Sequence, residues 1–134
     1  MKKNFKLKIK KNIFTRKTFS SWKKYLNNQD NRGHAERALP ENDFLPYINR
    51  CLNSSFESIE RIKKDTNNFK PKYILEIGSS AGTISLQAKK LYPESIVFGV
   101  EPEKEAVMVS KNMTKDLNLN HLFFINAEGE YLPF

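Results

Sequence analysis

The feature that most constrains the fold is an alternation of short apolar runs and helical segments that begins near Lys72. Apolar runs at Tyr73–Gly78, Ser95–Val100 and Leu122–Ile125 have the length and composition of strands. Between them, residues 82–92 and 103–118 carry apolar side chains at helical spacing. We expect the inward faces of these helices to hold Ile84, Ala88 and Leu91, and Ala106, Val109, Met113 and Leu117.

Strands that are apolar on both faces and alternate with helices are typical of a parallel sheet covered by helices. Right-handed crossovers give the three strands the spatial order 3-2-1. The sequence therefore predicts an α/β fold with a three-layer, Rossmann-like parallel sheet, truncated to about three strands.

A long amphipathic helix is predicted before the first strand, over residues 43–66. Asp43 is its expected N-cap, and Pro46 falls in the first turn, where a missing N–H does no harm. Asn67 and Asn68 end the helix. Its apolar face is formed by Phe44, Ile48, Cys51 or Leu52, Ser55, Ile59 and Ile62, so we interpret Cys51 as a core residue.

The net positive charge comes from the N-terminal part of the chain, because residues 38–134 carry a net charge of −2. The 134 residues contain 23 Lys or Arg and 15 Asp or Glu, a net charge of +8, but residues 1–37 alone carry +10. We therefore divide the chain into a basic, partly disordered arm and linker at 1–38 and an incomplete Rossmann-like domain at 39–134. Within the arm, Phe5, Leu7 and Ile9 alternate with Lys, as in a short strand.

Several classes of protein are excluded by the sequence. No apolar run approaches the roughly 20 residues of a membrane-spanning helix, and no secretory signal is visible. The single cysteine cannot form an internal disulfide, and no Cys/His set has zinc spacing, so we expect no metal and a cytoplasmic location. His34 and His121 are interpreted as ordinary surface or loop residues.

The turn after the first strand is the candidate binding site. Residues 76–83 read Glu-Ile-Gly-Ser-Ser-Ala-Gly-Thr, in which small residues let a ligand approach the backbone and a helix start offers free N–H groups. The dinucleotide pattern G-x-G-x-x-G fails, because Ser80 and Thr83 replace its later glycines. A P-loop is also excluded, because no Lys follows Gly82.

These residues resemble motif I of class I S-adenosylmethionine-dependent methyltransferases, E/D-x-G-x-G-x-G. Glu76, Gly78 and Gly82 match, and Ser80 replaces the middle glycine. The resemblance covers about residues 72–134 and implies S-adenosyl-L-methionine as the cofactor. It implies a cofactor-binding set of Glu76, Gly78, Ser79, Ser80, Ala81, Gly82, Glu101, Asn126, Ala127 and Glu128.

The resemblance also implies individual roles. Glu101, at the end of the second strand, would accept hydrogen bonds from the ribose hydroxyls, and Glu76 would order the loop and reach the amino group of the ligand. Asn126, Ala127 and Glu128 would contact the adenine. The alternatives are a structural glycine turn, a solvated loop carboxylate at Glu101 and merely polar turn residues at Asn126 and Glu128.

Members of the family continue into further strands. The resemblance therefore implies that the chain is the N-terminal portion of a longer methyltransferase, which binds the cofactor weakly or not at all alone and has no turnover. The strand at 73–77 would then be a sheet edge open to a C-terminal half or a partner chain, and the helix at 43–66 would cover part of the exposed face. No catalytic base can be named, and the unknown methyl acceptor is expected to be a small molecule, sugar or lipid.

A second class of function stays open, a non-catalytic partner chain. Such a chain would pair through strand 73–77, or use the arm at 1–28 on nucleic acid or an anionic membrane. In the arm, Trp22 and Tyr25 would stack on bases beside Arg16, Lys17, Lys23 and Lys24, unless the arm is simply solvated.

Overall fold

The computed structural model describes residues 10, 13–27 and 43–134. It contains α1 (Arg16–Asn27), α2 (Phe44–Asp65), β1 (Tyr73–Ile77), α3 (Thr83–Leu91), β2 (Ile96–Glu101), α4 (Lys104–Asp116) and β3 (Leu122–Asn126). The strand considered around Leu7 and the linker around His34 lie outside the described residues. From the helix predicted at 43–66 onward, each element lies close to its predicted position.

The strands form an open parallel sheet with β2 in the centre. The order β1-β2-β3 is the predicted 3-2-1 order, and both pairings are parallel. Tyr73 pairs with Ile96 and Ile77 with Val100, so the carboxyl ends of all three strands meet at one edge of the sheet. The structure thus shows an α/β arrangement with a three-stranded parallel sheet.

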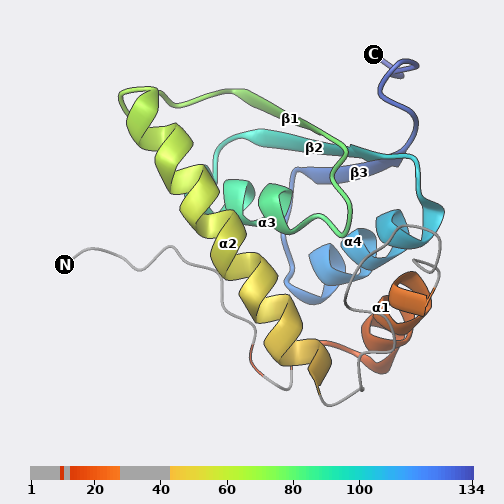
Figure 1. The fold of residues 1–134 in the computed structure, drawn as a ribbon. Coiled ribbons are helices and arrows are strands. Elements are labelled where there is room, and N and C mark those ends of the chain that lie inside the picture. The colour runs from red at the N-terminus through yellow and green to blue at the C-terminus, as the bar shows by residue number, and fades with distance from the viewer. Residues whose placement is uncertain (1–9, 11–12, 28–42) are drawn as a thin grey trace.

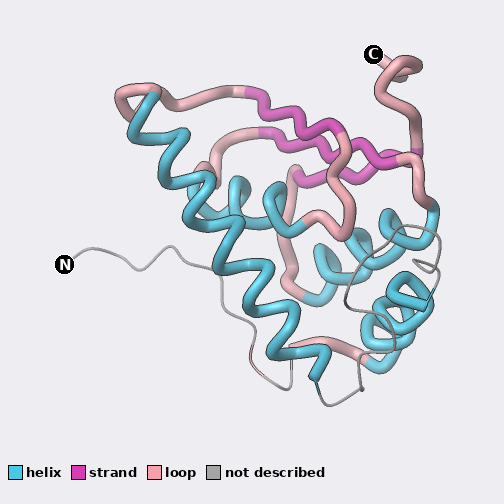
Figure 2. Tube along the Cα trace, in the orientation of Figure 1, coloured by secondary structure: helices cyan, strands magenta, loops and turns pink. Residues whose placement is uncertain are grey.

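The expected three-layer arrangement is not found, because all the described helices lie on one side of the sheet. Figures 1 and 2 show α1 to α4 on that side, with the strands above them and the C-terminal segment on the other side. Two successive right-handed crossovers that step the same way across a sheet place both connecting helices on the same face. The helix at 44–65 was expected to cover part of the opposite face, but it packs on α3 instead.

The main hydrophobic core lies between the sheet and the helices. Each described helix contributes to it, with Trp22 from α1, Ile48 from α2, Leu86 from α3 and Val109 from α4, while Val97 comes from the sheet. A smaller cluster joins α2 to α3 through Ile59, Ala88 and Leu91. The sheet face turned away from the helices keeps large apolar side chains exposed, among them Tyr73, Leu75, Ile77 and Phe123.

The predicted helix faces are confirmed except at two isoleucines. Ala106, Val109 and Met113 are buried as expected, but Ile84 is 37% exposed and Ile62 is 54% exposed. Ile84 lies in the first turn of α3, where the buried side chains are the neighbouring Ser85 and Leu86. Ile62 lies near the end of α2, beyond the part that packs on α3.

The ends of α2 differ in how closely they match the prediction. Asp43 precedes the helix, but its side chain makes no capping hydrogen bond within the described residues. At the other end, Asn67 and Asn68 take positive φ angles of 52° and 58°, which stop the helix as predicted.

Cys51, in the middle of the helix, is half-buried.

Candidate functional site

The predicted site residues come together at the carboxyl edge of the sheet. The loop between β1 and α3 begins with N–H groups of Gly78 and Ser79, which both donate to the carbonyl of Val100, at 2.8 and 3.0 Å. These bonds extend the β1–β2 pairing into the loop. The Gly82 N–H then donates to the Ser79 carbonyl at 2.8 Å, which closes the turn that leads into α3.

The two loop glycines take the same backbone conformation for different reasons. Gly78 has a φ of 74° and Gly82 a φ of 81°, in the left-handed region that favours glycine. A Cβ at Gly82 would lie 2.6 Å from the Phe124 ring and 2.7 Å from the Ser110 hydroxyl, whereas nothing lies within 4 Å of a Cβ at Gly78. Gly82 therefore permits close packing, and Gly78 borders open space.

Glu101 is built into the site and is not a solvated loop carboxylate. It is only 6% exposed, and its Oε2 accepts the Ser80 N–H at 2.8 Å. Its Oε1 accepts the Glu103 N–H at 2.9 Å, just before α4 begins. One carboxylate thus joins the end of β2 to the glycine loop and to the start of the next helix.

Glu76 is the second carboxylate at this edge. Its Oε2 accepts both the backbone N–H of Ser85, at 3.0 Å, and the Ser85 hydroxyl. Burial raises the pKa of Glu76 to about 7, although the bonds from Ser85 and the charge of Glu101 also act on it. At neutral pH, Glu76 therefore exists in both charged and neutral forms.

The turn after β3 is joined to the end of β2. The side-chain amide of Asn126 donates to the carbonyls of Glu101, at 3.0 Å, and Pro102, at 2.7 Å. The Ala127 N–H also donates to the Glu101 carbonyl, at 3.2 Å. Glu128 is exposed, and its backbone carbonyl accepts the Tyr131 N–H within the same turn.

Two residues that contact the loop were not predicted from the sequence. The phenol of Tyr25 lies 2.6 Å from the Ser80 hydroxyl. The Ser110 hydroxyl, which donates to the Ala106 carbonyl at 3.0 Å, lies 3.4 Å from the Ser80 carbonyl. The spacing of Thr18, Trp22 and Tyr25 could have indicated Tyr25 as an inward residue, because all three lie on one face of a helix.

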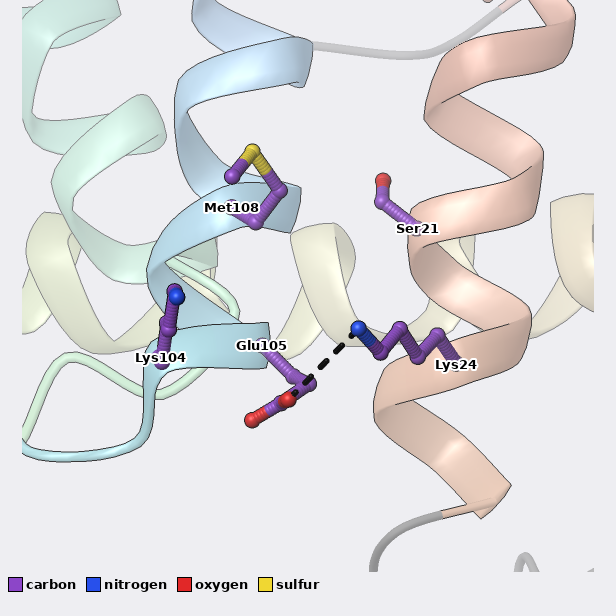
Figure 3. A pocket seen from close by; sticks show the side chains of 5 residues that line it. All are labelled: Ser21, Lys24, Lys104, Glu105 and Met108. Atoms are coloured by element: carbon purple, nitrogen blue, oxygen red, sulfur yellow. Dashed lines mark ion pairs between the residues drawn. The ribbon is translucent and has the colours of Figure 1, made fainter.

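The structure corrects the interpretation of Trp22 and Tyr25 as base-stacking rings in a basic arm. They are 1% and 6% exposed, and both belong to the main core. The cations of this segment lie on its outer surface, where Lys24 forms an ion pair of 3.9 Å with Glu105 beside a hollow of about 90 Å³ between α1 and α4 (Figure 3). Stacking on bases would require rings that this fold holds inside.

The charge at the carboxyl edge limits which ligands fit. Glu76 and Glu101 lie there, and residues 76–82, 99–103 and 126–130 contain no Lys or Arg. An anionic phosphate would meet the carboxylate of Glu101 and the partly ionised Glu76 without a balancing cation. Hydroxyl groups and positively charged groups, in contrast, would find hydrogen-bond acceptors.

Comparison with known proteins adds no identity to this site. No protein-family model matches the chain, and no curated protein matches it significantly. Within the described part, no three or more His, Cys, Asp or Glu side chains gather as a metal site would require. No described helix is both long and apolar enough to cross a bilayer.

Proposed function

We propose that the chain binds S-adenosyl-L-methionine at the 78–82 loop and supplies the cofactor-binding part of a Rossmann-like methyltransferase. One observation carries the proposal. Gly78 borders open space at the carboxyl end of β1, on the same sheet edge as the carboxylates of Glu76 and Glu101. In open α/β sheets, ligands bind beyond the carboxyl ends of the strands.

The chemistry of the edge supports this ligand over a nucleotide phosphate. The cofactor carries a sulfonium, an ammonium group and two ribose hydroxyls, which suit carboxylate acceptors. Glu101 is the proposed acceptor for the ribose, since each of its oxygens holds one N–H and keeps a second lone pair. Glu76 fixes the start of α3, where the loop ends, through its bond to Ser85, and it is proposed to order the loop in this way. The turn at Asn126, Ala127 and Glu128 is proposed to border the adenine.

The methyl group is already activated on the cofactor. The chain's own residues would therefore bind and orient it, and no protein nucleophile is required. The acceptor is proposed to be a small molecule, sugar or lipid, and a cytoplasmic location remains part of the proposal. Binding by this chain alone is expected to be weak and without turnover.

A titration followed by ¹⁵N amide spectra tests the proposal, because it detects weak binding residue by residue. S-adenosyl-L-homocysteine is added to millimolar concentration, with ATP as the phosphate-bearing comparison. We expect saturable shifts at the amides of Gly78, Ser80 and Glu103 with S-adenosyl-L-homocysteine, and none with ATP. Glu101→Ala should abolish the shifts, whereas Glu94→Ala, on the exposed loop before β2, should keep them. No shifts in the unmodified chain would overturn the proposal.

The exposed sheet face favours a second candidate, a non-catalytic partner chain. β1 pairs with β2 alone among the described strands, and Tyr73 and Ile77 are 60% and 58% exposed. The fitting partner is an extended apolar polypeptide segment that adds a strand to β1. This candidate predicts tight complex formation that Leu75→Lys abolishes and S-adenosyl-L-homocysteine does not affect.

A further proposal is that residues 1–28 bind nucleic acid or an anionic membrane through their cations. Among the described residues of this segment, Arg16, Lys17, Lys23 and Lys24 are exposed cations. Retention on heparin across a salt series, with and without charge reversal at Lys17 and Lys23, tests it. Unchanged retention would remove the idea.

A further inference from the structure

The N-terminal helix reaches the candidate site through one buried phenol. Tyr25, near the end of α1, is 6% exposed, so its hydroxyl is largely removed from water. That hydroxyl lies 2.6 Å from the Ser80 hydroxyl, across a sequence separation of 55 residues. A buried phenol needs such a polar partner, and here a residue of the glycine loop provides it.

Ser80 is the junction of the loop, because each of its polar groups lies against a different element. Its N–H donates to Glu101 of β2, and its hydroxyl meets Tyr25 of α1. Its carbonyl lies 3.4 Å from the Ser110 hydroxyl of α4, which donates at 3.0 Å to the Ala106 carbonyl. Ser80 also has a φ of 49°, a conformation that L residues rarely adopt without support. The bond to Tyr25 supplies part of that support.

The helix that carries Tyr25 is itself fixed in place. At its start, the Thr18 hydroxyl donates to Asp116 of α4 at 2.5 Å, and in its middle Trp22 is 1% exposed in the main core. The rings of Trp22 and Tyr25 contact edge to face, with centroids 5.9 Å apart. Tyr25 is therefore presented to the loop by a rigid support.

We propose that Tyr25 is a positioning residue of the ligand site, which acts through Ser80 to hold the Ser80 N–H on Glu101 and so fixes the carboxylate that receives the ligand. The inference deepens the proposed function and rests on it for the identity of the ligand. It makes α1 part of the site, although α1 precedes the first strand. Tyr25 itself need not touch the ligand.

The test uses Tyr25→Phe, which removes only the phenol oxygen. Tyr92→Phe is the matched control. Tyr92 is partly buried, but it follows the C-terminal end of α3, whereas the loop precedes the N-terminal end of that helix. Ser80→Ala removes the same bond from an exposed position and serves as the second variant if Tyr25→Phe folds poorly. Two quantities are measured for each full-length variant, amide hydrogen exchange without ligand and the Kd of S-adenosyl-L-homocysteine from ¹⁵N spectra.

We expect Tyr25→Phe to speed exchange at the Ser80 and Gly82 amides by about two- to tenfold, as for the loss of one hydrogen bond. Amides in the centre of β2 should not change relative to the unmodified chain, whereas a purely structural effect would accelerate the core amides as well. The Kd should rise by a similar factor. Ser80→Ala should have the same effects. The double variant Tyr25→Phe/Ser80→Ala should change the exchange rates and the Kd no further than either single variant does.

The outcomes separate this inference from the proposed function. If the unmodified chain binds and Tyr25→Phe matches Tyr92→Phe in both quantities, the inference is overturned and the proposed function stands. If the unmodified chain binds nothing, the proposed ligand is wrong, and hydrogen exchange decides the inference. Selective acceleration at Ser80 and Gly82 then upholds Tyr25 as a positioning residue of the loop, and uniform or absent acceleration overturns it.

Discussion

At the scale of single residues, alanine substitutions at Gly78 and Gly82 distinguish the cost of backbone strain from the cost of a steric clash. Alanine at either position pays the cost of a left-handed conformation, about 1–2 kcal/mol. At Gly82 the new methyl group would also meet Phe124 and Ser110, so Gly82→Ala should lower the free energy of unfolding by about 2–4 kcal/mol. Gly78→Ala should cost only the strain. Urea denaturation measures both variants, and equal losses would contradict the packing described around Phe124.

Glu76 makes the stability of the chain depend on pH. Its pKa rises from the ordinary value of 4.5 to about 7 on folding, so the folded chain binds a proton more tightly than the unfolded chain. The contribution of Glu76 to the free energy of unfolding is therefore fully present below pH 4.5. It is lost as the pH rises toward 7, by up to about 3 kcal/mol.

Glu76→Gln should remove this pH dependence, because the amide cannot ionise. We expect the variant to be more stable than the unmodified chain at pH 8 and to differ little at pH 4.5. Thermal unfolding at the two pH values measures the change. Glu57→Gln, at an exposed position on α2, is the control, and a shift of equal size in both variants would argue against burial as the cause.

The site residues divide into those that local sequence reveals and those that it does not. Gly78, Gly82 and Glu101 could be predicted because a strand that turns directly into a helix leaves a characteristic pattern of small and acidic residues. Tyr25 and Ser110 could not, because their roles depend on how α1 and α4 pack around the loop. The link between Asn126 and Glu101 likewise depends on the neighbouring positions of β2 and β3.

At the scale of elements, α1 is held at its start by a carboxylate from another helix. Asp116, the last residue of α4, accepts the Thr15 N–H at 2.9 Å and the Thr18 hydroxyl at 2.5 Å. The N-cap of α1 is Thr15, whose hydroxyl accepts the Thr18 N–H at 3.3 Å. Asp116 satisfies the N–H of that N-cap residue, as the acidic residue of a capping box would, although it comes from a distant part of the chain.

Asp116→Ala should loosen α1 at a cost of about 1–2 kcal/mol. Trp22 is the single tryptophan and is buried, so its emission reports whether α1 is docked. We expect a shift of that emission to lower energy at a lower urea concentration than in the unmodified chain. Asp65→Ala, at the last residue of α2, should leave the midpoint unchanged, and the same shift in both variants would refute the capping role.

The elements from α2 onward were predictable because their hydrophobic periodicity is clear. The helix predicted at 82–92 is observed at 83–91, and that predicted at 103–118 is observed at 104–116. α1 was obscured because its outer face is crowded with lysine, which resembles a solvated arm in composition. Only the spacing of its inward residues distinguishes a packed helix from a solvated arm. To use that spacing, one must know which surface the helix packs against.

At the scale of the whole molecule, the described helices all cover one face of the sheet. On the other face, the C-terminal segment contacts Phe98 through Phe134, and Tyr73, Leu75 and Ile77 of β1 remain exposed. Exposed apolar strands at a sheet edge promote association between chains. Leu75→Lys should therefore shift sedimentation toward the monomer in a concentration series, because the charge would lie in the middle of the exposed edge strand β1. Met108→Lys is the control, with 44% exposure on α4 against 43% for Leu75. Equal effects of the two variants would locate any association elsewhere.

The one-sided arrangement follows from rules that apply to any sequence with this order of elements. Three strands laid side by side in chain order require two crossovers of the same direction, which place α3 and α4 together. The position of α2 was harder to predict, because its amphipathic face could have covered either side. Packing on α3 through Ile59 and Ala88 determines the side.

The docking of α1 on α4 also has a consequence for the kinetics of folding. The strands and helices from β1 onward contact their neighbours in the chain, so they can form with short loops and a low contact order. The Thr18–Asp116 bond instead closes a loop of 98 residues, at an entropic cost of roughly 4 kcal/mol. Since a ribosome makes α1 before α4, α1 must wait until Asp116 has been synthesised before it finds its partner.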